Sequence, residues 1–440
     1  MRRNPRLVCC LLLACTAGSL QGETLSEAVT RAIVRFPDFR AAVASRRAAE
    51  QQTAQARGAL WPSVDATLGQ CRESSRNQST RPAGQDVALT RREAEVSVSQ
   101  LLFDGGGATG QVRRFDARSE GAAFQVAAAA EALALRVALA YMEVLRLRGQ
   151  VELAAQNVDR HQETLRQIEL LAEGGAGRRS DVYQTVARLA LAQSSLTQLQ
   201  GQLEQASAAY RHLAGPPAGE LRAPGNLESS VPTAFEAALE AAMSAHPAVR
   251  SAERDLVAAH ADRDSARARY APRINLELGM SHNRDLDGIP GLHADRFAML
   301  RLRQNLFRGG SDEARVQEAE IRIDEALANV GRARNDVERD LRQAWETLRA
   351  DRARMPQLAM HAGMSVQVVE AYKQQFRIGQ RTLLDVLNAE NEQFAARGNV
   401  LAGLYAVSSG EARVLAGAGK LLGALGVALP PEAKTEEGAR

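Results

Sequence analysis

The chain has 440 residues, of which 45% are hydrophobic and 24% charged, and this composition excludes a protein that is disordered throughout. Its formal net charge of +3 comes from Arg2, Arg3 and Arg6 and falls to zero without them. No basic excess then remains to attract nucleic acid, so that class of partner is not expected. Alanine accounts for 80 residues, which is typical of long, closely packed helices.

Residues 1–22 have the layout of a secretory signal peptide, with a basic start, an apolar run and then small residues. Two cleavage patterns fit. Ala17 and Ser19 form a small-x-small site, which we favour, whereas Cys15 stands where a bacterial lipoprotein would be cleaved and acylated. After simple cleavage the exported chain keeps only Cys71, which excludes an internal disulfide and a cysteine metal site.

The rest of the chain consists of two copies of one pattern. Trp61-Pro62 matches Ala271-Pro272 at an offset of 210 residues, and Leu102-Phe103-Asp104-Gly105-Gly106 matches Leu306-Phe307-Arg308-Gly309-Gly310 at an offset of 204. The copies are expected at 23–214 and 233–416. A proline-rich linker at 215–232 separates them, and a flexible C-terminal tail is expected at 417–440.

Each copy is predicted to begin with alanine-rich helices that end just before Pro62 or Pro272, because the residue before a proline resists the helical conformation. Apolar and polar residues then alternate, as in Val64, Ala66 and Leu68. This pattern predicts β-hairpins at about 63–103 and 273–307. Their strands approach the ~9 to 11 residues that a strand needs to cross a bilayer.

The glycine pairs Gly105-Gly106 and Gly309-Gly310 are predicted to turn the chain from strand into helix. The first helix runs for 65 residues without a proline, to Glu173, and would extend ~100 Å at about 1.5 Å per residue. It should return as a partner helix, and the second copy should form a matching pair with a kink at Pro356. Such lengths exceed what a globular domain needs.

Four strands are too few to close a barrel that spans a membrane, and open strand edges in lipid would leave backbone groups unpaired. After the leader, no stretch approaches the ~18 to 20 consecutive apolar residues of a membrane-spanning helix. If the exported protein crosses a membrane, it must therefore use strands, and several chains must share one barrel.

The chain resembles the TolC family of trimeric outer-membrane efflux channels over nearly its whole mature length. The resemblance rests on the proline-ended helices, the duplicated Gly-Gly turns and the segment Phe376-Arg377-Ile378-Gly379-Gln380-Arg381-Thr382-Leu383-Leu384-Asp385-Val386-Leu387-Asn388-Ala389-Glu390. It implies an α+β membrane protein in which three chains build a 12-stranded barrel in the outer membrane, continued by a long α-helical tunnel through the periplasm.

The same resemblance implies the exit duct of a tripartite export system. Its expected partners are two sibling subunits, outer-membrane lipid, a periplasmic adaptor of the membrane-fusion type and an inner-membrane transporter. The helix-return segment is more similar to members that serve protein-exporting ABC transporters, which favours type I protein secretion. Drug or small-molecule efflux remains the alternative.

The resemblance also assigns a periplasmic gate. Asp385 is expected in an acidic ring that faces the pore, and Arg381 is expected to tie the second hairpin to the first near Ser180 and Asp181. Like charges in a narrow constriction repel each other and attract cations, which would favour opening and select ions. The alternative is that these are merely exposed charges at a helix start, where an acid is favourable anyway.

Two residues of this gate depart from the family pattern. Phe376 stands where some members have a tyrosine that could donate a hydrogen bond, and Asn388 stands where some have a second aspartate. The gate of this chain is therefore expected to be held less tightly and to carry less negative charge.

Enzymatic functions are not expected. Residues 105–110 satisfy G-x-G-x-x-G, but the following helix is far too long for a dinucleotide-binding unit. The seven histidines show no metal-ligand spacing, so neither a metal nor a cofactor is expected. The remaining rival is a periplasmic coiled-coil adaptor whose hairpins never enter lipid.

Overall fold

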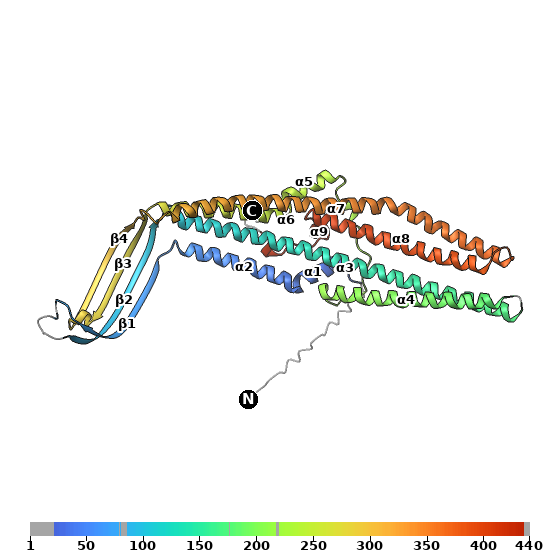
Figure 1. The fold of residues 1–440 in the computed structure, drawn as a ribbon, viewed down its shortest axis with the longest axis horizontal. Coiled ribbons are helices and arrows are strands. Elements are labelled where there is room, and N and C mark those ends of the chain that lie inside the picture. The colour runs from blue at the N-terminus through green and yellow to red at the C-terminus, as the bar shows by residue number, and fades with distance from the viewer. Residues whose placement is uncertain (1–21, 79, 81–85, 176, 217–219, 435–440) are drawn as a thin grey trace, which may run out of the picture.

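The computed structural model describes residues 22–78, 80, 86–175, 177–216 and 220–434. The signal peptide expected at 1–22 thus lies almost entirely outside the described residues. The molecule is elongated, with a β-sheet at one end and two helical hairpins that return at the other end (Figure 1). This arrangement confirms the predicted combination of four strands with long helices in two halves.

The four strands form one antiparallel sheet in chain order. They are β1 (Ser63–Ser75), β2 (Val87–Phe103), β3 (Arg273–Arg284) and β4 (Leu292–Arg303). The pairing of β2 with β3 joins the two copies, and its register places Val98 opposite Leu278. Because β1 and β4 are the outer strands, each presents one edge that has no partner strand among the described residues.

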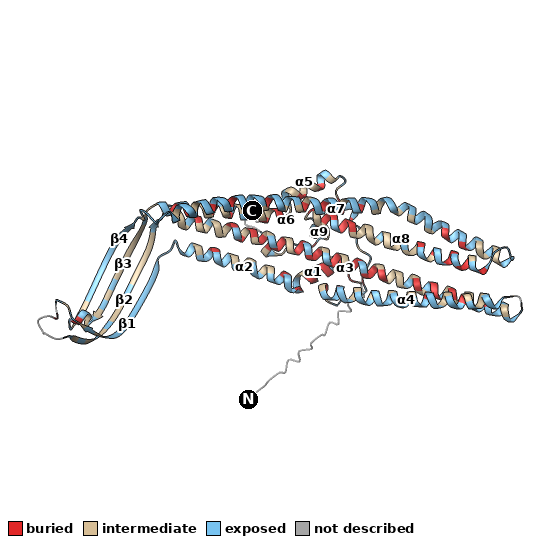
Figure 2. Ribbon diagram, viewed as in Figure 1, coloured by how far each residue is buried: buried red, intermediate tan, exposed pale blue. Residues whose placement is uncertain are grey.

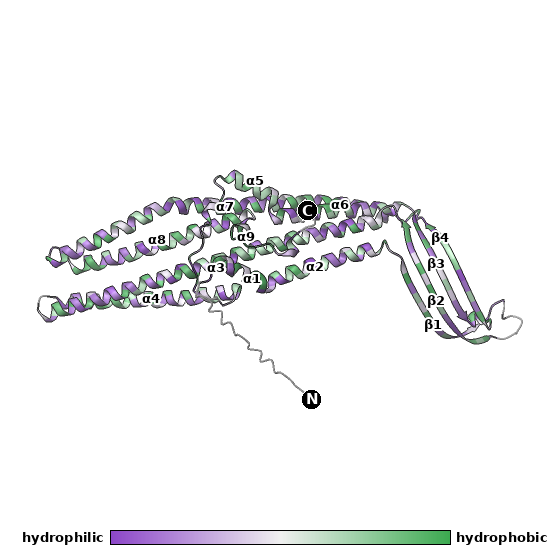
Figure 3. Cartoon of the chain, turned by 180° about the vertical axis from the view of Figure 1, so that it is seen from behind, coloured by the Kyte–Doolittle hydropathy of each residue, from purple (hydrophilic) through white to green (hydrophobic). Residues whose placement is uncertain are grey.

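The sheet is amphipathic across all four strands. Val64 lies opposite Val98, and Leu276 lies opposite Leu300, so the apolar residues share one face. On the first strand Leu68 is 83% exposed. The other face is polar and carries an ion pair between Glu277 and Arg301 (2.8 Å). Figure 3 colours both kinds of residue along the strands.

The two turns from helix to strand are built alike. Pro62 and Pro272 each stand directly before the first residue of a strand. Gln100 Nε2 donates to the carbonyl oxygen of Leu60 (3.0 Å). In the second copy, Gln304 Nε2 donates to the carbonyl oxygen of Tyr270 (2.9 Å). The duplication seen in the sequence is therefore a duplication of contacts.

Helices α2 (Pro37–Gly58) and α6 (Pro247–Arg267) precede the hairpins and pack along the helices that follow them. At their ends, Arg57 pairs with Asp116 (3.0 Å) and Arg267 pairs with Glu320 (2.7 Å). All four side chains are well exposed, so each pair contributes ~0 to 1 kcal/mol at most. Their value here is that they show equivalent packing in the two copies.

The long helices α3 (Gly107–Glu173) and α7 (Ser311–Arg377) each begin after a glycine pair. Gly106 and Gly310 have φ values of 88° and 83°, which lie in the left-handed region. The chain then returns through α4 (Arg179–Ala214) and α8 (Leu383–Gly417). Helix α7 continues through Pro356 without a break.

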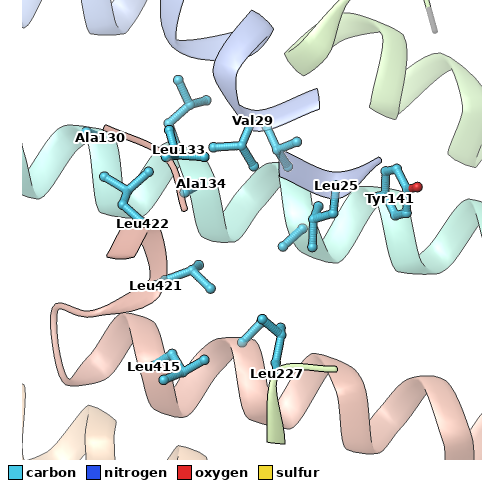
Figure 4. Close-up of a cluster of buried hydrophobic side chains, with 14 of the residues drawn as sticks. Leu25, Val29, Ala130, Leu133, Ala134, Tyr141, Leu227, Leu415, Leu421 and Leu422 are labelled. Carbon is cyan, nitrogen blue, oxygen red and sulfur yellow. The ribbon is translucent and has the colours of Figure 1, made fainter. Parts of the chain in front are cut away.

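The main core surrounds the middle of α3 (Figure 2). Helices α1 (Leu25–Arg35), α5 (Phe235–Ala245) and α9 (Leu421–Ala424) contribute to it. Figure 4 shows Leu133 of α3 together with Val29 from the N-terminal side and Leu422 from the C-terminal side. Both ends of the described chain are therefore anchored on one helix.

The expectation of a flexible tail at 417–440 is wrong for residues 418–434. Leu421 and Leu422 are 0% and 1% exposed, and the buried carboxylate of Glu131 accepts hydrogen bonds from their backbone N–H groups (3.1 and 3.3 Å). The glycines in this segment end helical turns, with φ values of 67° at Gly419 and Gly426. Residues 435–440 lie outside the described part.

The expectation about apolar stretches also needs correction, because α3 is long and apolar enough to cross a membrane by composition alone. Half of the relevant window is buried inside the protein. Alanines such as Ala130 and Ala134 create this apolar character, and they are fully buried against neighbouring helices. The apolar window of α3 is therefore explained by its packing in the core of the protein.

Candidate functional site

The two helical hairpins reverse direction at the end of the molecule farthest from the sheet (Figure 1). Gly175 and Gly379 lie in these returns, and each has a φ of 77°. Glycine adopts this left-handed conformation without the steric penalty that other residues incur. The duplicated glycines thus give both hairpins a return of the same kind.

Helix α8 begins with a capping box formed by Thr382 and Asp385. Thr382 Oγ1 accepts a hydrogen bond from the backbone N–H of Asp385 (3.3 Å), and the Asp385 carboxylate accepts from the hydroxyl (2.8 Å) and backbone N–H (3.2 Å) of Thr382. These bonds, assisted by Arg381 at 3.9 Å, hold the pKa of Asp385 below its usual range. Asp385 is therefore an ionised, partly exposed carboxylate.

Arg381 makes its contacts within the second hairpin. Its guanidinium carbon lies 4.1 Å from the centroid of the Tyr372 ring, and its Nε donates to Gln375 Oε1 (3.1 Å). The expected tie from Arg381 to Ser180 and Asp181 is not made within the described chain. A guanidinium is attracted to the face of a nearby aromatic ring, and here the ring belongs to α7, the helix that precedes Arg381 in the same hairpin.

Other residues join the hairpins near their returns. Arg188 Nη2 on α4 donates to Asn388 Oδ1 on α8 (2.8 Å), and Arg160 Nη1 on α3 donates to Gln393 Oε1 on α8 (2.8 Å). Of these residues, only Asn388 was singled out from the sequence. The partners lie 200 and 233 positions apart, and no local pattern identifies such pairs.

A small apolar cluster lies beside these links. Ile168 of α3 packs with Leu383 and Leu387 of α8, all of them buried, and Val182 and Phe376 pack against this cluster. Phe376 therefore has a packing role in this structure. Its ring supplies apolar contact where a tyrosine would add a hydroxyl.

The hairpins enclose a cavity of about 980 Å³ at this end. Four of the six predicted gate residues line it: Asp181, Phe376, Arg381 and Asp385. Ser180 lies outside the lining, although its hydroxyl donates to the neighbouring carboxylate of Asp181 (3.3 Å). Asn388 also lies outside and bridges to α4.

The lining of this cavity also includes an ion pair that the sequence did not predict, between the partly exposed Lys373 and the buried Glu390. Lys373 Nζ lies 2.7 Å from Glu390 Oε1, and Glu390 is 1% exposed. The nearby His161 is 3% exposed, and burial lowers the pKa of its imidazole, which favours the neutral form. Among the described residues, no group of three or more histidine, cysteine or acidic side chains is arranged to hold a metal.

The chain matches the family described as "Outer membrane efflux protein" over residues 28–216 and 238–420. It is 24% identical over 395 residues to the outer membrane efflux protein BepC of Brucella suis, which covers 87% of this chain and 82% of BepC. It is also 24% identical over 402 residues to the alkaline protease secretion protein AprF of Pseudomonas aeruginosa, which covers 89% of this chain and 83% of AprF.

Its fold is similar to a solved structure of CusC, described as a transmembrane channel, with a TM-score of 0.77, 18% identity and coverage of 92% of both chains. The two matched segments follow the two structural copies, each with a β-hairpin and a helical hairpin. The chain therefore belongs to the outer membrane efflux protein family of TolC-like channels, non-enzymatic transporters that lie in the outer membrane and extend by their helices into the periplasm.

Proposed function

We propose that three copies of this chain form one exit duct, with a 12-stranded barrel in the outer membrane and a helical tunnel below it. The observation that carries this proposal is the four-stranded sheet, which has an exposed apolar face and, in the described part of the chain, unpaired edges at β1 and β4. A strand edge that faces lipid leaves N–H and C=O groups without partners, at several kcal/mol each. Pairing β1 of one subunit with β4 of the next removes this cost.

The same sheet argues against a periplasmic adaptor whose hairpins remain in water. Leu68, Leu300 and Leu302 are 83%, 67% and 63% exposed on one face of the sheet. A large exposed apolar surface on a soluble protein is normally covered by a partner or a membrane. A lipid environment covers this face directly.

The proposed system is a type I secretion system that exports a polypeptide, in which a periplasmic adaptor and an inner-membrane ABC transporter meet the helical returns. The similarity to a protein named for the secretion of alkaline protease supports a polypeptide cargo. The similarity to the efflux protein BepC supports the alternative, a small-molecule cargo.

The proposed gate comprises the residues around the cavity at the helical returns. Asp181 and Asp385 line the cavity from the first and second hairpins, and Arg381 lies between the ring of Tyr372 and the carboxylate of Asp385. Around a threefold axis these carboxylates would repeat and form an acidic ring that selects cations. Asn388 and Phe376 hold the hairpins together beside this ring.

Two measurements test the proposal. The mass of the detergent-purified protein should equal three chains, and a single chain would contradict the shared barrel. Deletion of the gene should remove a polypeptide from the culture supernatant. If all secreted polypeptides remain and only resistance to small toxic compounds falls, the duct serves the alternative cargo.

A further inference from the structure

A second large cavity lies where the sheet meets the long helices, at the opposite end of α3 and α7 from the returns (Figure 1). It has a volume of about 890 Å³ and is lined by α3, α6, α7 and the adjoining ends of β2, β3 and β4. Seven arginines line it against only three acidic residues. The cavity is therefore strongly cationic in a chain whose charges otherwise nearly balance.

The strand register shows which side of the sheet this cavity occupies. Arg273 begins β3 and Arg303 ends β4, and both alternate with the apolar residues Leu276 and Leu300. Residues of opposite parity point to opposite faces of a sheet. Since the apolar face of a transmembrane barrel contacts lipid, the arginines face the interior of the channel.

Two of the arginines are placed in an unfavourable relation to each other. Arg273 and Arg303 are direct partners in the antiparallel register, and both are exposed. Like charges directly opposite each other destabilise a sheet. Neither residue forms an ion pair with a carboxylate among the described residues, and the same holds for the lining arginines Arg269 and Arg315.

The acidic residues of the lining are already engaged. The Asp104 carboxylate accepts two backbone N–H groups at the start of α3 (2.7 and 3.1 Å). Asp262 pairs with Arg114 (3.4 Å), and Glu318 pairs with Arg322 (2.5 Å). Among the described residues of the lining, none of the three carboxylates forms an ion pair with Arg269, Arg273, Arg303 or Arg315.

Arg114, which lines the cavity from α3, also lies among several positive charges. Its Nε is buried without a hydrogen-bond partner. Burial lowers the pKa of its guanidinium, and the nearby Arg118 and Arg315 act in the same direction against Asp262. An arginine nevertheless stays protonated in a protein, so Arg114 keeps its charge and occupies Asp262, which is then not a partner for the other arginines of the lining.

We propose that this arginine-lined cavity binds the carboxylate groups of cargo that passes from the helical tunnel into the barrel. A guanidinium group binds a carboxylate through two parallel hydrogen bonds. A carboxylate held between Arg273 and Arg303 also relieves their mutual repulsion. That the cargo is an acidic polypeptide rests on the proposed secretion function, whereas the preference of the cavity for carboxylates does not.

The test is a conductance measurement on the purified full-length protein in a planar lipid bilayer. Hexaglutamate, hexaglutamine or hexalysine is added on the barrel side, from which a peptide reaches the cavity without crossing the helical returns. We expect hexaglutamate alone to block the current. In the double variant Arg273→Gln/Arg303→Gln, the concentration needed for half block should rise roughly tenfold or more.

A matched control removes the same two charges from the same strands on the other face. Arg284 and Arg296 lie in β3 and β4 with the parity of the apolar residues, at the end of the sheet away from the helices. The variant Arg284→Gln/Arg296→Gln should be blocked like the natural protein. A second variant, Arg269→Gln/Arg315→Gln, leaves the sheet unchanged and should also weaken the block.

An unchanged block in both cavity variants would overturn the proposal, as would equal block by hexaglutamine. An unchanged block is the outcome expected if the arginines pair with carboxylates of a neighbouring subunit. The proposed secretion function is tested separately, by analysis of the culture supernatant of the deletion strain. If hexaglutamate blocks the channel but the deletion strain still secretes all its polypeptides, the carboxylate site is supported. Only the polypeptide nature of the cargo is then rejected.

Discussion

Glu131 is a carboxylate placed where its charge is costly. It lies on the alanine-rich part of α3, is 7% exposed, and caps the first backbone N–H groups of α9. Burial raises its pKa to about 7, and the two hydrogen bonds from Leu421 and Leu422 oppose this rise without cancelling it. The docking of the C-terminal segment is therefore linked to pH.

The direction of this dependence follows from the raised pKa. Below about pH 4.5, Glu131 is neutral in both the folded and the unfolded protein, and its contribution to the free energy of unfolding is fully present. This contribution is lost as the pH rises through about 7, the pKa in the folded protein. The loss is on the order of 3 kcal/mol. Amide hydrogen exchange of α9, corrected for intrinsic rates, should show protection that falls from pH 5 to pH 8.

The variant Glu131→Gln cannot ionise, so its α9 protection should be independent of pH over this range. Exchange in the middle of α8 serves as the internal control and should be alike in both proteins. If the variant keeps the pH dependence of the natural protein, another group controls the docking of α9.

The charge of Asp385 can be removed while its capping geometry is kept. Asp385→Asn retains an oxygen that accepts the hydrogen bond from Thr382, so α8 should still begin at the same place. We expect this variant to lower the preference for cations in a bilayer conductance measurement, because a carboxylate leaves the proposed ring. Asp385→Glu should preserve the preference, and unchanged selectivity of the asparagine variant would remove Asp385 from the ring.

At the scale of the elements, the internal duplication supplies matched pairs of positions. Gly105 and Gly309 occupy equivalent turns from strand to helix, with φ values of 69° and 62°. An added Cβ at Gly105 would lie 2.3 Å from the Cβ of Ala271 and 3.0 Å from the carbonyl oxygen of Ala268, whereas at Gly309 nothing lies within 4 Å. The two turns share a backbone conformation but differ in their surroundings.

This difference predicts unequal effects of one substitution. Gly309→Ala should cost roughly 1 to 2 kcal/mol from the left-handed backbone alone. Gly105→Ala adds the clash with Ala268 and Ala271, which follow α6, and this clash is worth roughly another 1 to 3 kcal/mol. Unfolding of the detergent-solubilised protein by denaturant should give a lower midpoint for Gly105→Ala. Equal midpoints would mean that the turn relaxes away from α6.

How far the sequence predicts each element depends on the range of the interaction. Pro62, Pro272 and the glycine pairs act on their own backbone, so the turns could be placed from the chain alone. The partner of Arg381 could not be predicted in this way, because the choice between a ring on the preceding helix and a carboxylate on the other hairpin depends on tertiary packing. The prediction of a flexible C-terminal tail was wrong for a related reason. In the sequence alone, glycines that end helical turns cannot be told from the glycines of a disordered segment.

At the scale of the whole molecule, the proposals depend on which face of the sheet meets lipid. Cys71, the only cysteine among the described residues, is exposed on edge strand β1. It has the parity of Asp65 and Thr67 and so lies on the polar face. Leu68 lies three positions away on the apolar face and is 83% exposed in the single chain.

These neighbouring positions allow the two faces to be told apart by thiol chemistry in lipid vesicles. A water-soluble maleimide should react with Cys71, because a thiol must ionise to react and water in the channel permits this. In Leu68→Cys/Cys71→Ser, the thiol should face hydrocarbon, where the thiolate is costly. Its rate of reaction should therefore be lower than that of Cys71 by a factor of roughly ten or more. Both thiols should react alike after unfolding in denaturant.

The reverse order of rates would place the polar face against lipid. The cavity that contains Arg273 and Arg303 shares the face of Cys71, so the same result would turn those arginines toward the lipid instead of the channel. A fast Cys71 and a slow thiol at position 68 therefore support both the orientation of the barrel and the channel-facing position of the carboxylate site.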